Sequence, residues 1–215
     1  MEKKHQVHNL IILDESGSME SIKEPIISGF NELVQSIKGI EKQFPEQEHF
    51  ITFVTFNTAG RKVIHFMDPV AKLKKISSST YKPSEMTPLF DAMGNSITSL
   101  RQALEKQTDH NVLVTVLTDG LENASKEYTG NAIKKLVEDM KMAGWTFTYI
   151  GTDHDVETIA KSISITNVMF FKKDLSGVND MFRKERNARA MYSQKIRNKE
   201  NTDNDFYEPD EPKKS

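Results

Sequence analysis

The chain alternates between short apolar runs and longer segments whose apolar residues recur every three or four positions. Residues 10–13 and 112–117 form continuous rather than alternating runs, a pattern typical of strands buried on both faces, which are usually parallel. Four further β-rich runs complete the set. The expected strands are 7–14, 49–56, 62–66, 111–118, 146–151 and 166–171.

Five segments carry the single apolar stripe of an amphipathic helix. The stripes begin at Ile22, Leu89, Ile133, Val156 and Leu175. Strands that alternate with helices favour right-handed crossovers. We therefore predict an α/β fold with a doubly wound, mostly parallel six-stranded sheet and helices on both faces. The runs 49–56 and 62–66 are only a hairpin apart, so the second is predicted to be an antiparallel edge strand.

The length of 215 residues favours one domain. We assign residues 1–197 to it. From Asn198 onward Phe206 and Tyr207 are almost the only apolar residues, and prolines and charges dominate. This composition predicts a disordered acidic C-terminal tail over 198–215. Because Asp205 and Glu208 flank those two aromatic residues, the tail is also a candidate ligand for a site on its own chain.

Charge and composition exclude several function classes. The 29 Lys and Arg residues against 31 Asp and Glu give a net charge of −2, which argues against a nucleic-acid or anionic-membrane binder. The longest aliphatic run, 10–13, is far below the ~20 residues of a spanning helix. Without cysteine there are no disulfides, zinc–thiolate sites or iron–sulfur clusters. The first nine residues lack the apolar segment of a secretory signal. We expect a cytoplasmic protein, and nothing indicates its oligomeric state.

Polar side chains follow the buried strands where a parallel sheet gathers ligands. Asp14, Ser16 and Ser18 follow the first strand in an Asp-x-Ser-x-Ser pattern, Asp119-Gly120 follows the fourth, and Thr87-Pro88 precedes the second long helix. The predicted fold brings all three segments to one edge. The three hydroxyls could bind Mg²⁺, a cation that prefers oxygen ligands, and the two aspartates could bind it or hold its waters.

Each segment also has a simpler interpretation. Asp-x-Ser-x-Ser can arise by chance. Thr87-Pro88 could be only an N-cap with proline at the first helical position. Asp119-Gly120 could be only a turn. The six histidines, at 5, 8, 49, 65, 110 and 154, do not pair at helical metal spacing and are expected to be ordinary surface or strand-edge residues. The three segments together nevertheless favour a metal site.

These motifs resemble the metal-ion-dependent adhesion site of von Willebrand factor type A domains, also called integrin I-like domains. The matching stretches are residues 14–19, 87–89 and 117–120, and the resemblance covers roughly Val7 to Ile196. It implies a Rossmann-like sheet with one antiparallel edge strand. It also implies hydroxyl ligands from Ser16, Ser18 and Thr87, with Asp14 and Asp119 acting directly or through water. Many relatives have glycine before the threonine, where this chain has Met86.

The resemblance implies a metal-dependent protein-binding module rather than an enzyme. The cation, Mg²⁺ or alternatively Mn²⁺, would coordinate an Asp or Glu carboxylate of a partner protein. Met19 and Met86 adjoin the motif and are candidates for an apolar rim. One alternative is a phosphohydrolase of the haloacid dehalogenase type, but the position of its acid–base Asp is Ser16 here. The other is a metal-free intracellular scaffold.

Overall fold

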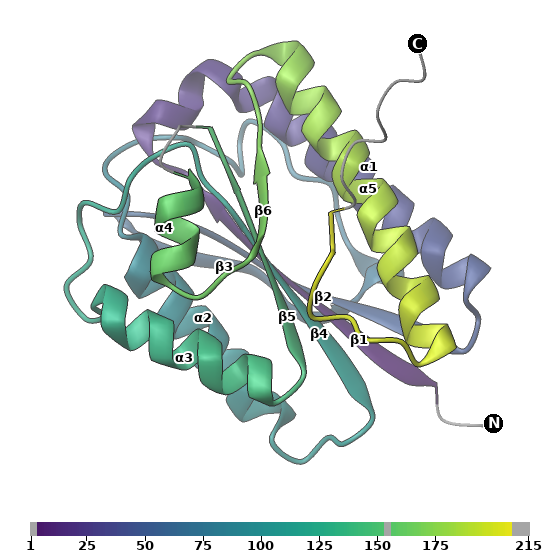
Figure 1. The fold of residues 1–215 in the computed structure, drawn as a ribbon. Coiled ribbons are helices and arrows are strands. Elements are labelled where there is room, and N and C mark those ends of the chain that lie inside the picture. Colours follow the sequence, from purple (N-terminus) through teal and green to yellow (C-terminus); the bar gives the residue numbers. More distant parts are fainter. Residues whose placement is uncertain (1–3, 153–155, 208–215) are drawn as a thin grey trace, which may run out of the picture.

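The computed structural model describes residues 4–152 and 156–207, so His154 and residues 208–215 of the predicted tail lie outside the described residues. The described chain forms one six-stranded sheet (Figure 1). The strands are β1 (His5–Asp14), β2 (Gln47–Asn57), β3 (Gly60–Pro69), β4 (His110–Leu117), β5 (Trp145–Gly151) and β6 (Asn167–Phe170). The α-helices are α1 (Lys23–Gln43), α2 (Leu89–Leu104), α3 (Gly130–Met142), α4 (Val156–Ser162) and α5 (Leu175–Asn198).

The sheet has the strand order β3-β2-β1-β4-β5-β6. β1 pairs in parallel with both β2 and β4, and β5 and β6 continue the parallel side. β3 pairs antiparallel with β2 at the edge. The prediction of a doubly wound, mostly parallel sheet with one antiparallel edge strand is confirmed. Since the chain winds outward in opposite directions from β1 and β4, the switch point lies between them, where ligands bind in open α/β sheets.

Helices cover both faces of the sheet, as Figure 1 shows: α1 and α5 lie on one side and α2, α3 and α4 on the other. Successive residues of β1 enter opposite cores. Leu10 and Ile12 pack under α2 and α3, whereas Ile11 and Leu13 pack under α1. This explains the continuous apolar run, because both sides of β1 are buried. None of the helices in the described part of the chain is both long and apolar enough to cross a membrane.

The described residues after α5, up to Tyr207, return across the sheet, where Thr202 contacts Thr146 of β5 and Asp203 contacts Asn167 of β6. Phe206 is only 4% exposed, packs against Tyr192 and donates its backbone N–H to the Asn167 side chain. The prediction of a disordered tail from residue 198 is therefore wrong for the described residues up to 207. Its two aromatic residues give this polar segment enough apolar surface to bury. Because the Phe206 ring is buried in the domain, it is not available in this structure as an apolar contact for the predicted self-ligand.

Two histidines lie inside the molecule near the amino ends of the central strands. His8 is buried, and its ring stacks on Phe50 at a centroid distance of 5.1 Å. His49 is buried on the opposite face of the sheet. Burial lowers the pKa of His8 to about 4 and that of His49 to about 3. The expectation of ordinary surface or strand-edge histidines is wrong for these two.

Candidate metal-binding site

Asp14 ends β1 at the switch point, and both of its carboxylate oxygens are hydrogen-bonded. Oδ1 accepts the backbone N–H of Ser16 at 2.7 Å, and Oδ2 accepts the hydroxyl of Thr118 at 2.7 Å across the β1–β4 boundary. Burial raises the pKa of Asp14 to about 6, although these hydrogen bonds oppose the shift. Thr118 was not among the predicted site residues, yet it fixes the orientation of this carboxylate.

Ser16 and Ser18 join Asp14 to Asp119. Their hydroxyl oxygens lie 3.1 Å apart, and Ser18 Oγ donates to Asp119 Oδ1 at 2.6 Å. The side chain of Asp119 is 0% exposed. The loops after β1 and β4 were predicted to lie close together, and their side chains are in direct contact.

Gly120 marks the point on which the oxygens from all three loops converge. A Cβ atom built on Gly120 would lie 3.1 Å from Thr87 Oγ1, 3.7 Å from Ser18 Oγ and 3.8 Å from Asp14 Oδ2. Because a Cβ only 3.1 Å from an oxygen is crowded, glycine leaves room between these donors. Together with the Ser16 and Asp119 contacts to Ser18, the five predicted ligand residues all lie in one cluster.

The start of α2 is capped from another loop and not by Thr87. Pro88, not Thr87, is the N-cap residue, and it makes no side-chain capping bond. Glu122 accepts the first-turn N–H of Phe90 at 2.8 Å, and Ser125 accepts that of Asp91 at 3.0 Å. The interpretation of Thr87-Pro88 as an N-cap with proline at the first helical position is wrong.

The same loop also holds the backbone of Thr87, whose N–H donates to Asn123 Oδ1 at 2.9 Å. The loop after β4 therefore contributes Asp119 and Gly120 and also holds the start of α2 beside them. Sequence spacing gave no signal for this role of Glu122, Asn123 and Ser125, because side chains that cap a helix from another loop follow no local pattern.

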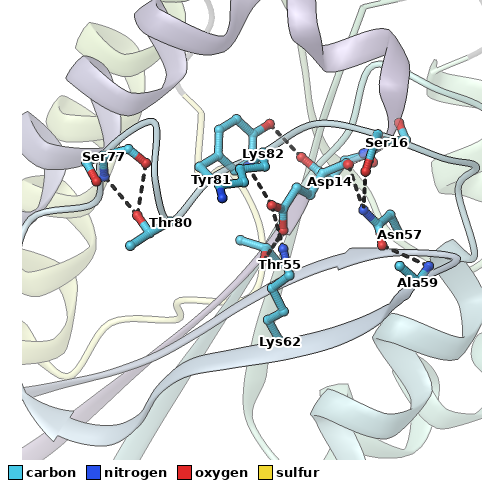
Figure 2. Close-up of polar contacts among 12 residues, drawn as sticks. Asp14, Ser16, Thr55, Asn57, Ala59, Lys62, Ser77, Thr80, Tyr81 and Lys82 are labelled. Carbon is cyan, nitrogen blue, oxygen red and sulfur yellow. Dashed lines mark hydrogen bonds and ion pairs between the residues drawn. The ribbon is translucent and has the colours of Figure 1, made fainter.

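Glu15, between two predicted ligands, anchors the loop that carries Thr87. Its side chain is 1% exposed and accepts hydrogen bonds from the Thr55 hydroxyl, the Lys62 ammonium and the backbone N–H of Lys82. Tyr81 donates its hydroxyl to the backbone carbonyl of Asp14 at 2.7 Å. Figure 2 shows Tyr81 pointing toward Asp14, with Thr55 and Lys62 extending from the neighbouring strands. Sequence reasoning missed both Glu15 and Tyr81.

The apolar rim differs from the predicted one. Met19 is 0% exposed and packs in the core under α1, so its assignment to a partner-binding rim is wrong. The short 3₁₀ helix of residues 17–22 turns its side chain inward. Met86 is 51% exposed, and Leu121, which follows Gly120, is equally exposed. The exposed apolar residues that adjoin predicted site residues in sequence are therefore Met86, before Thr87, and Leu121, after Gly120. The position of Leu121 directly after the Asp119-Gly120 motif could have identified it.

A cation of the protein itself reaches the cluster. Lys173 Nζ forms an ion pair of 2.6 Å with Asp119 Oδ2, a buried oxygen that has no other polar partner among the described residues. Lys173 comes from the connection between β6 and α5, far along the chain from the other site residues. No motif pointed to it.

The donor set fits a hard divalent cation in its chemistry. All of the donors are oxygens, from three hydroxyls and two carboxylates, which is the ligand type that Mg²⁺ and Mn²⁺ prefer. Asp119 Oδ2 is a buried carboxylate oxygen whose one polar partner among the described residues is the Lys173 ammonium. Within residues 4–152 and 156–207 no three His, Cys, Asp or Glu side chains form a group that could hold a metal ion. A cation here would therefore depend on the hydroxyls of Ser16, Ser18 and Thr87.

Known proteins of solved structure share the fold of this chain. None of the curated proteins matches the sequence. Among solved structures, a mutant of the PilB minor pilin of Streptococcus sanguinis has a TM-score of 0.55 and 13% identity, over 91% of this chain and 63% of that one. The pilus adhesin SpaC of Lactobacillus rhamnosus GG, in its open conformation, has a TM-score of 0.60 and 12% identity, over 89% and 30%.

The vWF domain of the type V pilus tip protein Mfa5 of Porphyromonas gingivalis is similar over 85% of this chain and 95% of that domain, with a TM-score of 0.58 and 11% identity. The chain thus spans less than two thirds of the pilin and of the adhesin, but nearly all of the isolated domain. At these identities the likeness shows the fold. The family model for the von Willebrand factor type A domain matches residues 10–184, most of the sequence, and the chain therefore belongs to that family.

Proposed function

We propose that this chain is a metal-dependent protein-binding module. Asp14, Ser16, Ser18, Thr87 and Asp119 would hold Mg²⁺, or alternatively Mn²⁺, at the carboxyl edge of the sheet, directly or through water. The observation that supports this proposal is the convergence of Thr87, Ser18 and Asp14 oxygens within 3.8 Å of the position of a Cβ on Gly120. When bound, the cation would supply a positive charge that attracts an anionic oxygen.

The charges of the site favour a carboxylate as the external ligand. Ser16, Ser18 and Thr87 contribute neutral oxygens, and both oxygens of Asp14 already accept hydrogen bonds from the protein. A divalent cation held in this way keeps much of its charge. An Asp or Glu side chain of a partner protein is the ligand that such a charge selects.

The surroundings of the cluster favour a protein partner over a small anion. Met86 and Leu121 are half exposed, adjoin Thr87 and Gly120 in sequence, and could pack against residues that flank the partner's carboxylate. The pilus adhesin is by its name a protein of attachment, which agrees with a binding role for the shared fold. We infer that the module binds and does not catalyse a reaction.

Thermal unfolding with and without metal tests the cation site. Mn²⁺ or Mg²⁺ should raise the melting temperature, because a ligand that binds only the folded state stabilises it. Ser18→Ala should reduce this rise strongly, since it removes a hydroxyl from the cluster. Ser21→Ala is the matched control, because Ser21 is exposed on the same short helix. An equal rise in both variants would contradict the assignment.

Binding of an acidic peptide tests the partner class. A labelled peptide Gly-Leu-Asp-Leu-Gly should bind in Mg²⁺ and lose binding in EDTA, and the same peptide with Asn in place of Asp should bind in neither. Equal binding of the Asp peptide with and without metal would favour the metal-free scaffold instead.

A further inference from the structure

Lys173 is placed against the candidate metal site by a connection that is fixed at both ends. Before it, the buried Phe171 donates its backbone N–H to the carbonyl of Gly151, at the end of β5. After it, Asp174 caps α5 by accepting the N–H of Gly177 at 2.7 Å. The lysine backbone is therefore held between a strand and a helix start, and its side chain reaches the loop after β4.

The two oxygens of Asp119 have different environments. Oδ1 accepts the hydroxyl of Ser18, whereas the buried Oδ2 pairs with the Lys173 ammonium at 2.6 Å and has no other polar partner among the described residues. A buried carboxylate is costly unless a positive charge compensates it. Lys173 supplies this charge when no metal is bound.

We propose that Lys173 is the built-in counter-ion of the metal site and sets its charge balance. The inference rests on the proposed function, because it requires a cation beside Asp119. The ammonium and the cation share one carboxylate and repel each other, so Lys173 weakens cation binding. Because the ammonium also neutralises Asp119, a bound cation keeps more of its charge for the carboxylate of a partner.

Direct measurement of Mn²⁺ affinity tests the first half of this proposal. Electron paramagnetic resonance of free Mn²⁺ would be used on the full chain and on Lys173→Met, Lys173→Arg and Lys172→Met. Lys173→Met should bind Mn²⁺ on the order of tenfold more tightly, because a nearby like charge is removed. Lys173→Arg keeps the charge and should stay near the wild type. Lys172→Met removes an equal charge from an exposed neighbour and should also stay near it.

A second measurement separates the charge effect from a structural one. In EDTA the melting temperature of Lys173→Met should fall, since Asp119 loses its counter-ion, and the rise on adding Mn²⁺ should be larger than in the wild type. With Mn²⁺ saturating, the Gly-Leu-Asp-Leu-Gly peptide should bind Lys173→Met more weakly than Lys173→Arg.

The outcomes distinguish this inference from the proposed function. Equal or weaker Mn²⁺ binding by Lys173→Met, with binding intact in the other proteins, overturns the role of Lys173 and leaves the metal site in place. Equal peptide affinities in Lys173→Met and Lys173→Arg overturn the second half of the proposal. If none of the four proteins binds Mn²⁺, both the proposed function and the inference are wrong.

Discussion

The hydroxyl of Tyr207 donates a hydrogen bond of 2.8 Å to the carboxylate of Glu185 beneath α5. Glu185 pairs with Arg189 at 2.7 Å, and both of these side chains are only 2% exposed. Arg189 also donates to Asn9 and Thr115 on the sheet, each at 2.7 Å. The segment after the last helix thus completes a buried polar network between that helix and the strands. A polar group in such a network that lacks its hydrogen bond destabilises the folded state.

Removal of the Tyr207 hydroxyl should therefore destabilise the protein. Tyr207→Phe leaves an oxygen of Glu185 without this donor, and we expect a loss of about 1–3 kcal/mol in the free energy of unfolding. Phe206→Ala should cost about 3–5 kcal/mol, because it empties a buried aromatic position. Chemical denaturation measures both. Asn204→Ala, an exposed neighbour, is the control. Losses no larger than that of the control would mean that the segment does not pack in solution.

Gly29 allows α1 to approach α5 closely. A Cβ built there would lie 2.0 Å from the ring of Phe182, whereas a Cβ on Gly39, in the same helix, would meet nothing within 4 Å. Gly29→Ala should destabilise the protein by about 1–3 kcal/mol through overpacking. Gly39→Ala should stabilise it by about 0.5–1 kcal/mol, since alanine is the better helix former. Urea unfolding of the two variants would give opposite signs, and equal signs would contradict the close packing of α1 on α5.

Thr87 should affect metal binding without affecting the helix cap. Because Glu122 and Ser125 bond the first turn of α2, Thr87→Ala removes no capping bond and should change the metal-free free energy of unfolding by less than about 1 kcal/mol. It should nevertheless lose most of the increase in melting temperature that Mn²⁺ produces, while Thr87→Ser should keep it. A large loss of stability without metal, or a full Mn²⁺ response in the alanine variant, would contradict this role.

Much of the fold could be predicted from the sequence because its signals are local. The continuous run 112–117 became a central strand, and the apolar stripe that begins at Leu89 became α2. The five predicted ligand residues could be brought together because parallel strands share one carboxyl edge. What escaped prediction depends on contacts between residues distant in sequence. Lys173 follows no motif.

Two errors show the limits of reasoning from neighbours along the chain. Met19 adjoins Ser18 in sequence, but a turn of 3₁₀ helix carries its side chain into the core. Phe206 lies in a segment whose composition is typical of disorder, yet its buried ring packs against Tyr192 and the neighbouring Tyr207 bonds Glu185. The mean composition of a segment does not reveal that one or two of its side chains are buried.

The burial of His49 should make the protein sensitive to mild acid. Its backbone N–H donates to Glu41, but neither ring nitrogen has a hydrogen-bond partner among the described residues. Burial is the main cause that lowers the pKa from 6.5 to about 3, and the charges of Arg189 and His5 add to it. The folded state therefore holds the ring neutral, whereas the unfolded chain takes up a proton below about pH 6.5. This contribution to stability is complete above pH 6.5 and is lost as the pH falls toward 3.

The variant His49→Leu isolates this contribution, because an apolar side chain of similar size replaces a ring that makes no hydrogen bond. Between pH 6.5 and 4 the wild type should lose on the order of 3 kcal/mol more unfolding free energy than the variant. At pH 7.5 the two proteins should differ by less than about 1.5 kcal/mol, as expected for exchange of side chains of similar volume. Denaturant unfolding at pH 7.5, 6, 5 and 4 gives the dependence of the unfolding free energy on pH for each protein. Since His8 remains in the variant with its own pKa of about 4, some acid sensitivity should persist. If the unfolding free energies of the two proteins fell equally with pH, His49 would not be held neutral in the folded state.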